Sequence, residues 1–277
     1  MTQFFPLFSQ LLKIFFSAVF VSRLKRVQDY STVFWPAQKY FCLFFDGVTF
    51  DSVPEWSMTA QTFLVRHAQA SFGQSNYDQL SDLGALQARE LGKHLHQAAI
   101  PFEAVYCGQL RRHGQTLEGI LSSGIALPTP SLIPALNEYD ADSLLQALGE
   151  STGVDTQNVA SHFRQLRMAL RAWMQGELTP TGMPTFVDFQ EGLKDLLNQI
   201  QSQHSGRVLV VSSGGPISCL VASLLGADVD ATIALNFRLR NASITELAYD
   251  VKRHHLISFN EVSHLRPHQN PGWVTFV

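Results

Sequence analysis

An arginine and a histidine stand side by side at the end of a short apolar stretch in this 277-residue chain. Residues 62–65 predict a buried strand, because three of the four are apolar, and the strand ends at Arg66 and His67. Ligand sites of open α/β sheets lie beyond the carboxyl ends of the strands. The guanidinium of Arg66 suits a phosphate or a carboxylate, and a neutral imidazole can attack phosphorus. The two residues therefore predict chemistry on an anion.

Two further strand ends carry polar residues of the same kind. Residues 102–106 predict a second strand, and Arg112 follows it at the start of a helix. Residues 208–211 are all apolar, as in a central strand, and the Ser-Gly-Gly of residues 213–215 comes next. Glycines let the backbone approach an anion, and the start of a helix offers free N–H groups. Since parallel strands end at one edge of a sheet, these groups predict a phosphate cradle beside His67.

The pattern of the elements predicts the fold class. A polar loop and a helix from Ser81 or Asp82 to about residue 97 follow the first strand. Helices are also expected at about 142–149, 158–176, 186–203 and 217–225, and strands at 241–249 and 256–259. We expect a three-layer α/β domain over residues 58–277. It has a mixed, mostly parallel sheet, helices on both faces and a helical cap insertion.

The overall composition excludes several classes of function. The formal net charge is -3 and 16% of the residues are charged, without a long basic run, so no nucleic-acid surface is predicted. Cys42, Cys107 and Cys219 are too widely spaced for a disulfide framework or a zinc site, and a reducing compartment fits them best. The ten histidines lack the spacing of a metal-binding helix, so no metal is expected.

Residues 1–57 differ in composition from the rest of the chain. They hold eleven of the twenty phenylalanines and few acidic residues, so we place a boundary near Met58. Residues 4–22 are almost long enough to span a bilayer and are followed by basic residues, which is compatible with a membrane anchor. Lys13 interrupts this stretch and no cleavage site is evident. The preferred interpretation is that the extension arises from a mis-assigned start of the protein.

From about residue 60 to 262 the chain resembles the histidine phosphatase superfamily, the phosphoglycerate mutase-like proteins, in five segments that follow the same order. The strand ending in Arg66-His67-Ala68 is similar to the family's Arg-His-Gly strand, with alanine in place of glycine. The other four are the Leu-Ser-x-x-Gly-x-x-Gln-Ala of residues 80–88, the Leu-x-Arg-x-x-Gln-Thr of residues 110–116, the Leu-x-Glu of residues 136–138 and the strand start at 241–245.

The resemblance implies a reaction and the residues that carry it. His67 would take the phosphoryl group as phosphohistidine while Arg66 and Arg112 hold it, and water would then release phosphate. Glu138 would donate a proton to the leaving alcohol and afterwards act as base toward the water. No metal or organic cofactor is implied. Two polar residues of the loop after His67 are candidates for substrate contact, namely Gln69 and Asn76.

One further departure from the family pattern bears on the chemistry. The last motif of the family usually reads Ser-His-Gly-Gly, and its histidine is the other half of the catalytic pair. Here Ser213 takes that place, ahead of Gly214, a phosphate-binding candidate. A hydroxyl donates one hydrogen bond but carries no positive charge, so we expect a rate loss of about 10²- to 10³-fold. His113 is not expected to compensate, because neighbours on a helix point about 100° apart. A helix cap is the other interpretation of Ser213.

The predicted function is a phosphomonoester hydrolase that acts through phosphohistidine on His67, with a phosphorylated small molecule or a phosphoprotein as substrate. The alternative is a catalytically weak or silent module that binds phosphate or phosphopeptides. Phosphotransfer of the phosphoglycerate mutase type is less favoured, because nothing marks a site that would re-donate the phosphoryl group. We predict a cytoplasmic protein, or a membrane-anchored one if residues 1–22 are a real anchor.

Overall fold

The computed structural model describes residues 60–71, 78–149, 159–266 and 269–276. The predicted extension of residues 1–57 and the candidate residue Asn76 lie outside these ranges. Within them, no helix combines the length and the apolarity that a membrane crossing needs.

Six strands form one mixed sheet in the order β3-β2-β4-β1-β5-β6. The first four strands of that order run parallel, β5 is antiparallel to β1, and β6 is antiparallel to β5. The strands are β1 (Gln61–Arg66), β2 (Phe102–Cys107), β3 (Ser131–Leu132), β4 (Arg207–Ser212), β5 (Ile244–Tyr249) and β6 (His254–Glu261). The predicted mixed, mostly parallel sheet is confirmed.

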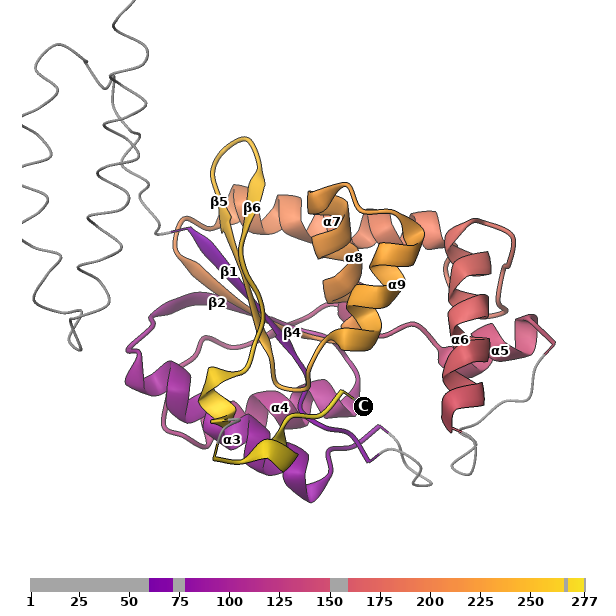
Figure 1. Ribbon diagram of the computed structural model, residues 1–277. Helices are drawn as coiled ribbons and strands as arrows, with labels where there is room; N and C mark the ends of the chain where they lie inside the picture. The colour runs from indigo at the N-terminus through magenta and orange to yellow at the C-terminus, as the bar shows by residue number, and fades with distance from the viewer. Residues whose placement is uncertain (1–59, 72–77, 150–158, 267–268, 277) are drawn as a thin grey trace, which may run out of the picture. The chain divides into compact units, whose positions relative to one another are not determined.

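The described residues form seven α-helices (Figure 1). Helices α3 and α4 cover one face, and α7 and α8 pack over the other. The helices are α3 (Asp82–Gln97), α4 (Arg111–Leu121), α5 (Ala141–Ala147), α6 (Val159–Met174), α7 (Phe186–Gln203), α8 (Gly214–Leu225) and α9 (Val229–Arg238). A short 3-10 helix, η2 (Pro134–Leu136), leads into the segment that holds Glu138.

Adjacent residues of the central strands enter different cores. Val65 and Val211 pack with α3 and α4, whereas Leu64 and Val210 belong to the larger core with α6, α7 and α8. Side chains alternate across a strand, so an all-apolar run is what a strand covered on both faces requires. The predicted three-layer arrangement is therefore confirmed.

The ends of two helices follow local signals of the sequence. Ser81 caps α3 by accepting a hydrogen bond from the backbone N–H of Gly84 at 3.0 Å. Gly226 ends α8 in the left-handed conformation, with φ at 63°. Helix α8 begins at Gly214, earlier than predicted, so that its first turn lies directly after β4.

Helix α9 was absent from the prediction, and the strand predicted at 241–249 begins only at Ile244. The cap of α9 was readable, because Asp228 accepts a hydrogen bond from the backbone N–H of Ala231 at 2.8 Å. Ala242, with φ at 55°, precedes the start of β5 and explains the delayed strand.

The helical insertion between β3 and β4 packs around aromatic side chains. Trp173 of α6 is buried, and its ring centre lies 5.1 Å from that of Phe186 and 5.3 Å from that of Phe189, both on α7. The predicted helical insertion is confirmed.

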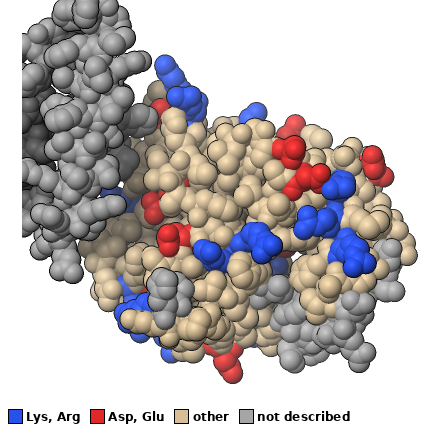
Figure 2. Space-filling model, in the orientation of Figure 1, with Lys and Arg blue, Asp and Glu red and all other residues tan. Residues whose placement is uncertain are grey.

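On the face of the molecule seen in Figure 2, Lys and Arg side chains are interspersed with Asp and Glu side chains.

Candidate active site

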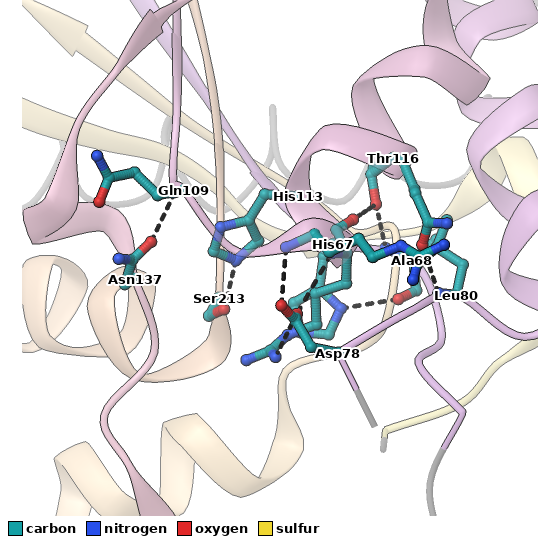
Figure 3. Close-up of polar contacts among 12 residues, drawn as sticks. His67, Ala68, Asp78, Leu80, Gln109, His113, Thr116, Asn137 and Ser213 are labelled. Atoms are coloured by element: carbon teal, nitrogen blue, oxygen red, sulfur yellow. Dashed lines mark hydrogen bonds and ion pairs between the residues drawn. The ribbon is translucent and has the colours of Figure 1, made fainter. Parts of the chain in front are cut away.

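The carboxyl ends of β1, β2 and β4 meet at one edge of the sheet. Arg66 of β1 lies opposite Ser212 of β4, and Cys107 of β2 lies opposite Val211. The backbone N–H of His67 donates to the carbonyl of Ser212 at 2.8 Å. The residues that follow these strands are thereby brought together (Figure 3).

His67 is held in one tautomer. Its Nδ1 lies 2.7 Å from the carbonyl oxygen of Ala68, which can only accept, so Nδ1 carries the proton and Nε2 the lone pair. The side chain is 1% exposed. Burial, and then the charges of Arg112 and Arg66, hold the pKa of His67 well below its ordinary value. A neutral imidazole whose lone pair lies on Nε2 is what a nucleophile at neutral pH requires.

Arg66 is oriented by backbone oxygens from distant parts of the chain. Its NH1 donates to the carbonyl of Leu239, which follows α9, and to that of Phe276 at 2.8 Å. The side chain is buried next to His67, so its charge acts on the same small space. The sequence placed Arg66 at the strand end but could not show that two carbonyls fix its guanidinium.

Arg112 bridges His67 and an aspartate that sequence reasoning missed. Its Nε donates to Nε2 of His67 at 3.3 Å, and its NH1 forms an ion pair with Asp78 at 3.0 Å. Asp78 also accepts from the backbone N–H of Arg111 at 2.9 Å, at the start of α4. Asp78 ends the polar loop after His67, and no periodicity or motif distinguished it from the other residues of that loop. It orients the arginine that faces His67.

Glu138 reaches the site from the segment after η2. Its Oε1 accepts a hydrogen bond from the backbone N–H of Gly215 at 2.9 Å. A Cβ at Gly215 would stand 2.3 Å from the same oxygen, so only glycine lets the carboxylate approach the start of α8. Burial raises the pKa of Glu138, against the opposing charges of Arg112 and Arg66. A raised pKa suits a carboxyl group that must donate a proton.

The expectation that the side chain of His113 points away from the site was wrong. His113 is fully buried, its Nε2 lies 2.6 Å from Oγ of Ser213, and its ring centre lies 5.7 Å from that of His67 (Figure 3). Arg112 and His113 both belong to the first turn of α4. The N-terminal end of α4 lies within the site. The side chains of Arg112 and His113 therefore both enter the site, although they point in different directions from the helix. Ser213 stands at the N-cap position of α8, as the helix-cap interpretation expected, but its side chain makes no hydrogen bond to that helix.

Gln69, a candidate for substrate contact, is engaged elsewhere. Its Oε1 accepts from the hydroxyl of Ser81 at 2.8 Å, and its backbone N–H donates to Gln87 at 2.8 Å. These contacts connect the loop after His67 to the first turns of α3. Gln69 therefore lies beside the site and supports the position of its loop.

Acidification below about pH 6.5 is expected to destabilise the protein, because buried histidines resist protonation. Burial lowers the pKa of His67 strongly, that of His113 to about 3 and that of His264 to about 4. The unfolded chain takes up protons at these positions below about pH 6.5, whereas the folded chain does not. The free energy of unfolding therefore decreases as the pH is lowered. Glu138 acts in the opposite sense, because its raised pKa favours proton binding by the folded state.

Urea denaturation at pH 7 and at pH 5 measures this effect. Each fully buried histidine is expected to cost up to about 2 kcal/mol at pH 5 relative to pH 7. The variant His264→Asn, outside the candidate site, should lose about 2 kcal/mol less over this interval than the parent. Equal losses in the two proteins would show that the folded state protonates His264 freely.

Comparisons with known proteins identify relatives of this chain. A family model described as the histidine phosphatase superfamily (branch 1) matches residues 62–262. The adenosylcobalamin/alpha-ribazole phosphatase of Escherichia coli (strain K12) is 27% identical over an alignment of 180 residues, which covers 61% of this chain and 81% of that protein. Residues 62–262, which the family model matches, include the site residues Arg66, His67, Arg112, His113, Glu138 and Ser213.

Two solved structures share the fold. Bacillus stearothermophilus YhfR has a TM-score of 0.57 at 21% identity, with 74% of this chain and 98% of that chain covered. A mutant phosphoserine phosphatase from Entamoeba histolytica, crystallised with phosphoserine, has a TM-score of 0.52 at 20% identity, with coverage of 74% and 98%.

Proposed function

The chain belongs to the histidine phosphatase superfamily, and on that premise we propose that it is a phosphomonoester hydrolase that works through phosphohistidine on His67. The orientation of His67 carries the proposal. With Nδ1 bound to the carbonyl of Ala68, the lone pair lies on Nε2, and Arg112 lies 3.3 Å from that nitrogen. A phosphoryl group bound by Arg112 would be placed next to the nucleophilic atom.

The proposed reaction has two displacements. In the first, Nε2 of His67 bonds to phosphorus while the bond to the ester oxygen breaks, and Glu138 protonates that oxygen. In the second, water attacks phosphorus as Glu138 takes its proton, the bond to His67 breaks, and inorganic phosphate leaves. Arg66 and Arg112 would balance the charge of the phosphoryl oxygens, and the backbone N–H of Gly214 at the start of α8 would donate to one of them.

The proposed substrate is a small phosphorylated molecule. The names of two similar proteins, an alpha-ribazole phosphatase and a phosphoserine phosphatase, support this class. The proposal is tested by assaying the full chain with p-nitrophenyl phosphate and with phosphoserine, with inorganic phosphate release as the readout.

Arg112→Ala is expected to lower kcat/KM by about 10²- to 10³-fold, because it removes a charged donor from the phosphoryl group. It should also weaken inhibition by orthovanadate, an anion that resembles the phosphoryl group. Arg111→Ala is the matched control, since Arg111 is the exposed neighbour on the same turn. Equal effects of the two substitutions would mean that Arg112 contributes only through the net charge of α4.

The phosphate-binding module, the alternative function, makes a different prediction. In that case the full chain would bind inorganic phosphate, Arg112→Ala would weaken this binding, and no substrate would be turned over. Turnover that disappears on replacement of His67 would exclude the module.

A further inference from the structure

Ser213 and His113 come from elements that are far apart in the sequence and share one buried hydrogen bond. Ser213 precedes α8, His113 lies in the first turn of α4, and both side chains are 0% exposed. Oγ of Ser213 lies 2.6 Å from Nε2 of His113. An N-cap serine ordinarily bonds to the helix that it starts, yet this one bonds to a histidine of another helix.

The position of the His113 ring is closely defined by its surroundings. A Cβ at Gly108, just after β2, would stand 2.1 Å from Nδ1 of His113, so the ring fills space that only glycine leaves open. On its other side lies His67, with ring centres 5.7 Å apart and planes inclined by 43°. His113 is thus held between the end of β2 and the nucleophile (Figure 3).

We propose that Ser213 and His113 act as one hydrogen-bonded unit that serves as the second phosphoryl-directed donor of this site. In the protonated imidazole that a bound phosphoryl dianion favours, Nδ1 faces the backbone of Gly108 and Nε2–H donates to Oγ of Ser213. The hydroxyl proton of Ser213 is thereby directed to an oxygen of the phosphoryl group. The imidazole of the usual Ser-His-Gly-Gly motif is replaced by a histidine on α4 that acts through a serine. Ser213 is the catalytic residue of the unit, and His113 is a positioning residue. The inference rests on the proposed function.

The charges around His113 fit this role. Burial lowers the pKa of His113 to about 3. The charge of Arg112 lowers this pKa further and that of Asp78 raises it, so His113 is neutral without a bound anion. The charge of a phosphoryl dianion favours the protonated form of a nearby imidazole. The hydrogen bond from His113 to Ser213 therefore becomes stronger when the phosphoryl group is present.

A double-mutant cycle tests whether the two residues act as a unit. Ser213→Ala and His113→Ala are each expected to lower kcat by about 10- to 100-fold, with KM within about threefold of the parent. The double variant should be no slower than the slower single variant, because either change removes the same donor. Losses that multiply in the double variant would overturn the proposal, as would an unchanged kcat in His113→Ala.

Relocation of the histidine separates this role from a merely structural one. In the background of His113→Ala, the further change Ser213→His is expected to restore kcat by at least about tenfold. His264→Ala also removes a buried histidine, outside the site, and should lower thermal stability while leaving kcat unchanged. No recovery on relocation would contradict the proposed unit.

Orthovanadate affinity decides the inference independently of turnover. If the full chain hydrolysed no phosphomonoester, the proposed function would fail, but vanadate would still occupy the cradle. The unit then predicts that Ser213→Ala, His113→Ala and the double variant weaken vanadate binding by the same factor of about 10 or more. Parent-like affinity in all three would overturn it.

Discussion

Replacing His67 with alanine is expected to abolish turnover, with kcat reduced by about 10⁴-fold or more, because the atom that receives the phosphoryl group is lost. The cradle itself should persist. Arg66 is held by the carbonyls of Leu239 and Phe276, and Arg112 by Asp78, so neither arginine depends on the imidazole alone. Orthovanadate should therefore still bind to the variant.

His264→Ala is the matched control for this change, as a buried histidine outside the candidate site. It should retain the activity of the parent, whereas His67→Ala should not. If His67→Ala kept more than about one tenth of the parental kcat, another group would have to be the nucleophile.

Glu138→Gln is expected to have an effect that depends on the leaving group. Phosphoserine loses an alkoxide and needs a proton donor, so kcat on this substrate should fall by about 10²- to 10⁴-fold. p-Nitrophenolate leaves readily without a proton, so hydrolysis of p-nitrophenyl phosphate should fall far less. Glutamine can still accept from the backbone N–H of Gly215, which preserves the local geometry.

Asp140→Asn is the control for the loss of a nearby carboxylate. Asp140 is exposed and caps α5 by accepting from the backbone N–H of Asp142 and of Ser143, and asparagine can replace it in that role. The control should behave as the parent on both substrates. Equal losses on phosphoserine and p-nitrophenyl phosphate in Glu138→Gln would show that Glu138 is not the proton donor.

The pH dependence should change as well. With a raised pKa, Glu138 stays protonated to a higher pH than an ordinary glutamate, and kcat/KM for phosphoserine should fall as pH rises through that pKa. Glu138→Gln should lack this limb of the profile.

Much of the fold could be predicted because its signals are local. The apolar run of β4, the Ser81 cap of α3 and Gly226 after α8 each specify an element through a few adjacent residues. Helix α9 was missed although Asp228 carries a readable cap. Its apolar residues follow no clear period, and no element was predicted there.

The site residues that follow strand ends could be predicted from the sequence. The contacts between residues far apart in the sequence could not. Arg66 and His67 end a strand, but the carbonyls that hold Arg66 come from segments 173 and 210 residues away. The bond between His113 and Ser213 spans 100 residues and depends on where α4 begins. The angle of about 100° between neighbouring residues of a helix says nothing about where the end of α4 lies relative to the site.

The most direct test of the account is to trap the phosphorylated enzyme. The full chain is mixed with excess p-nitrophenyl phosphate, quenched in alkali, where phosphohistidine survives, and digested for tandem mass spectrometry. The account predicts one added phosphoryl group on the peptide that contains His67, absent in His67→Ala and more abundant when the second displacement is slowed. Rapid turnover without this adduct, or an adduct on another residue, would contradict it.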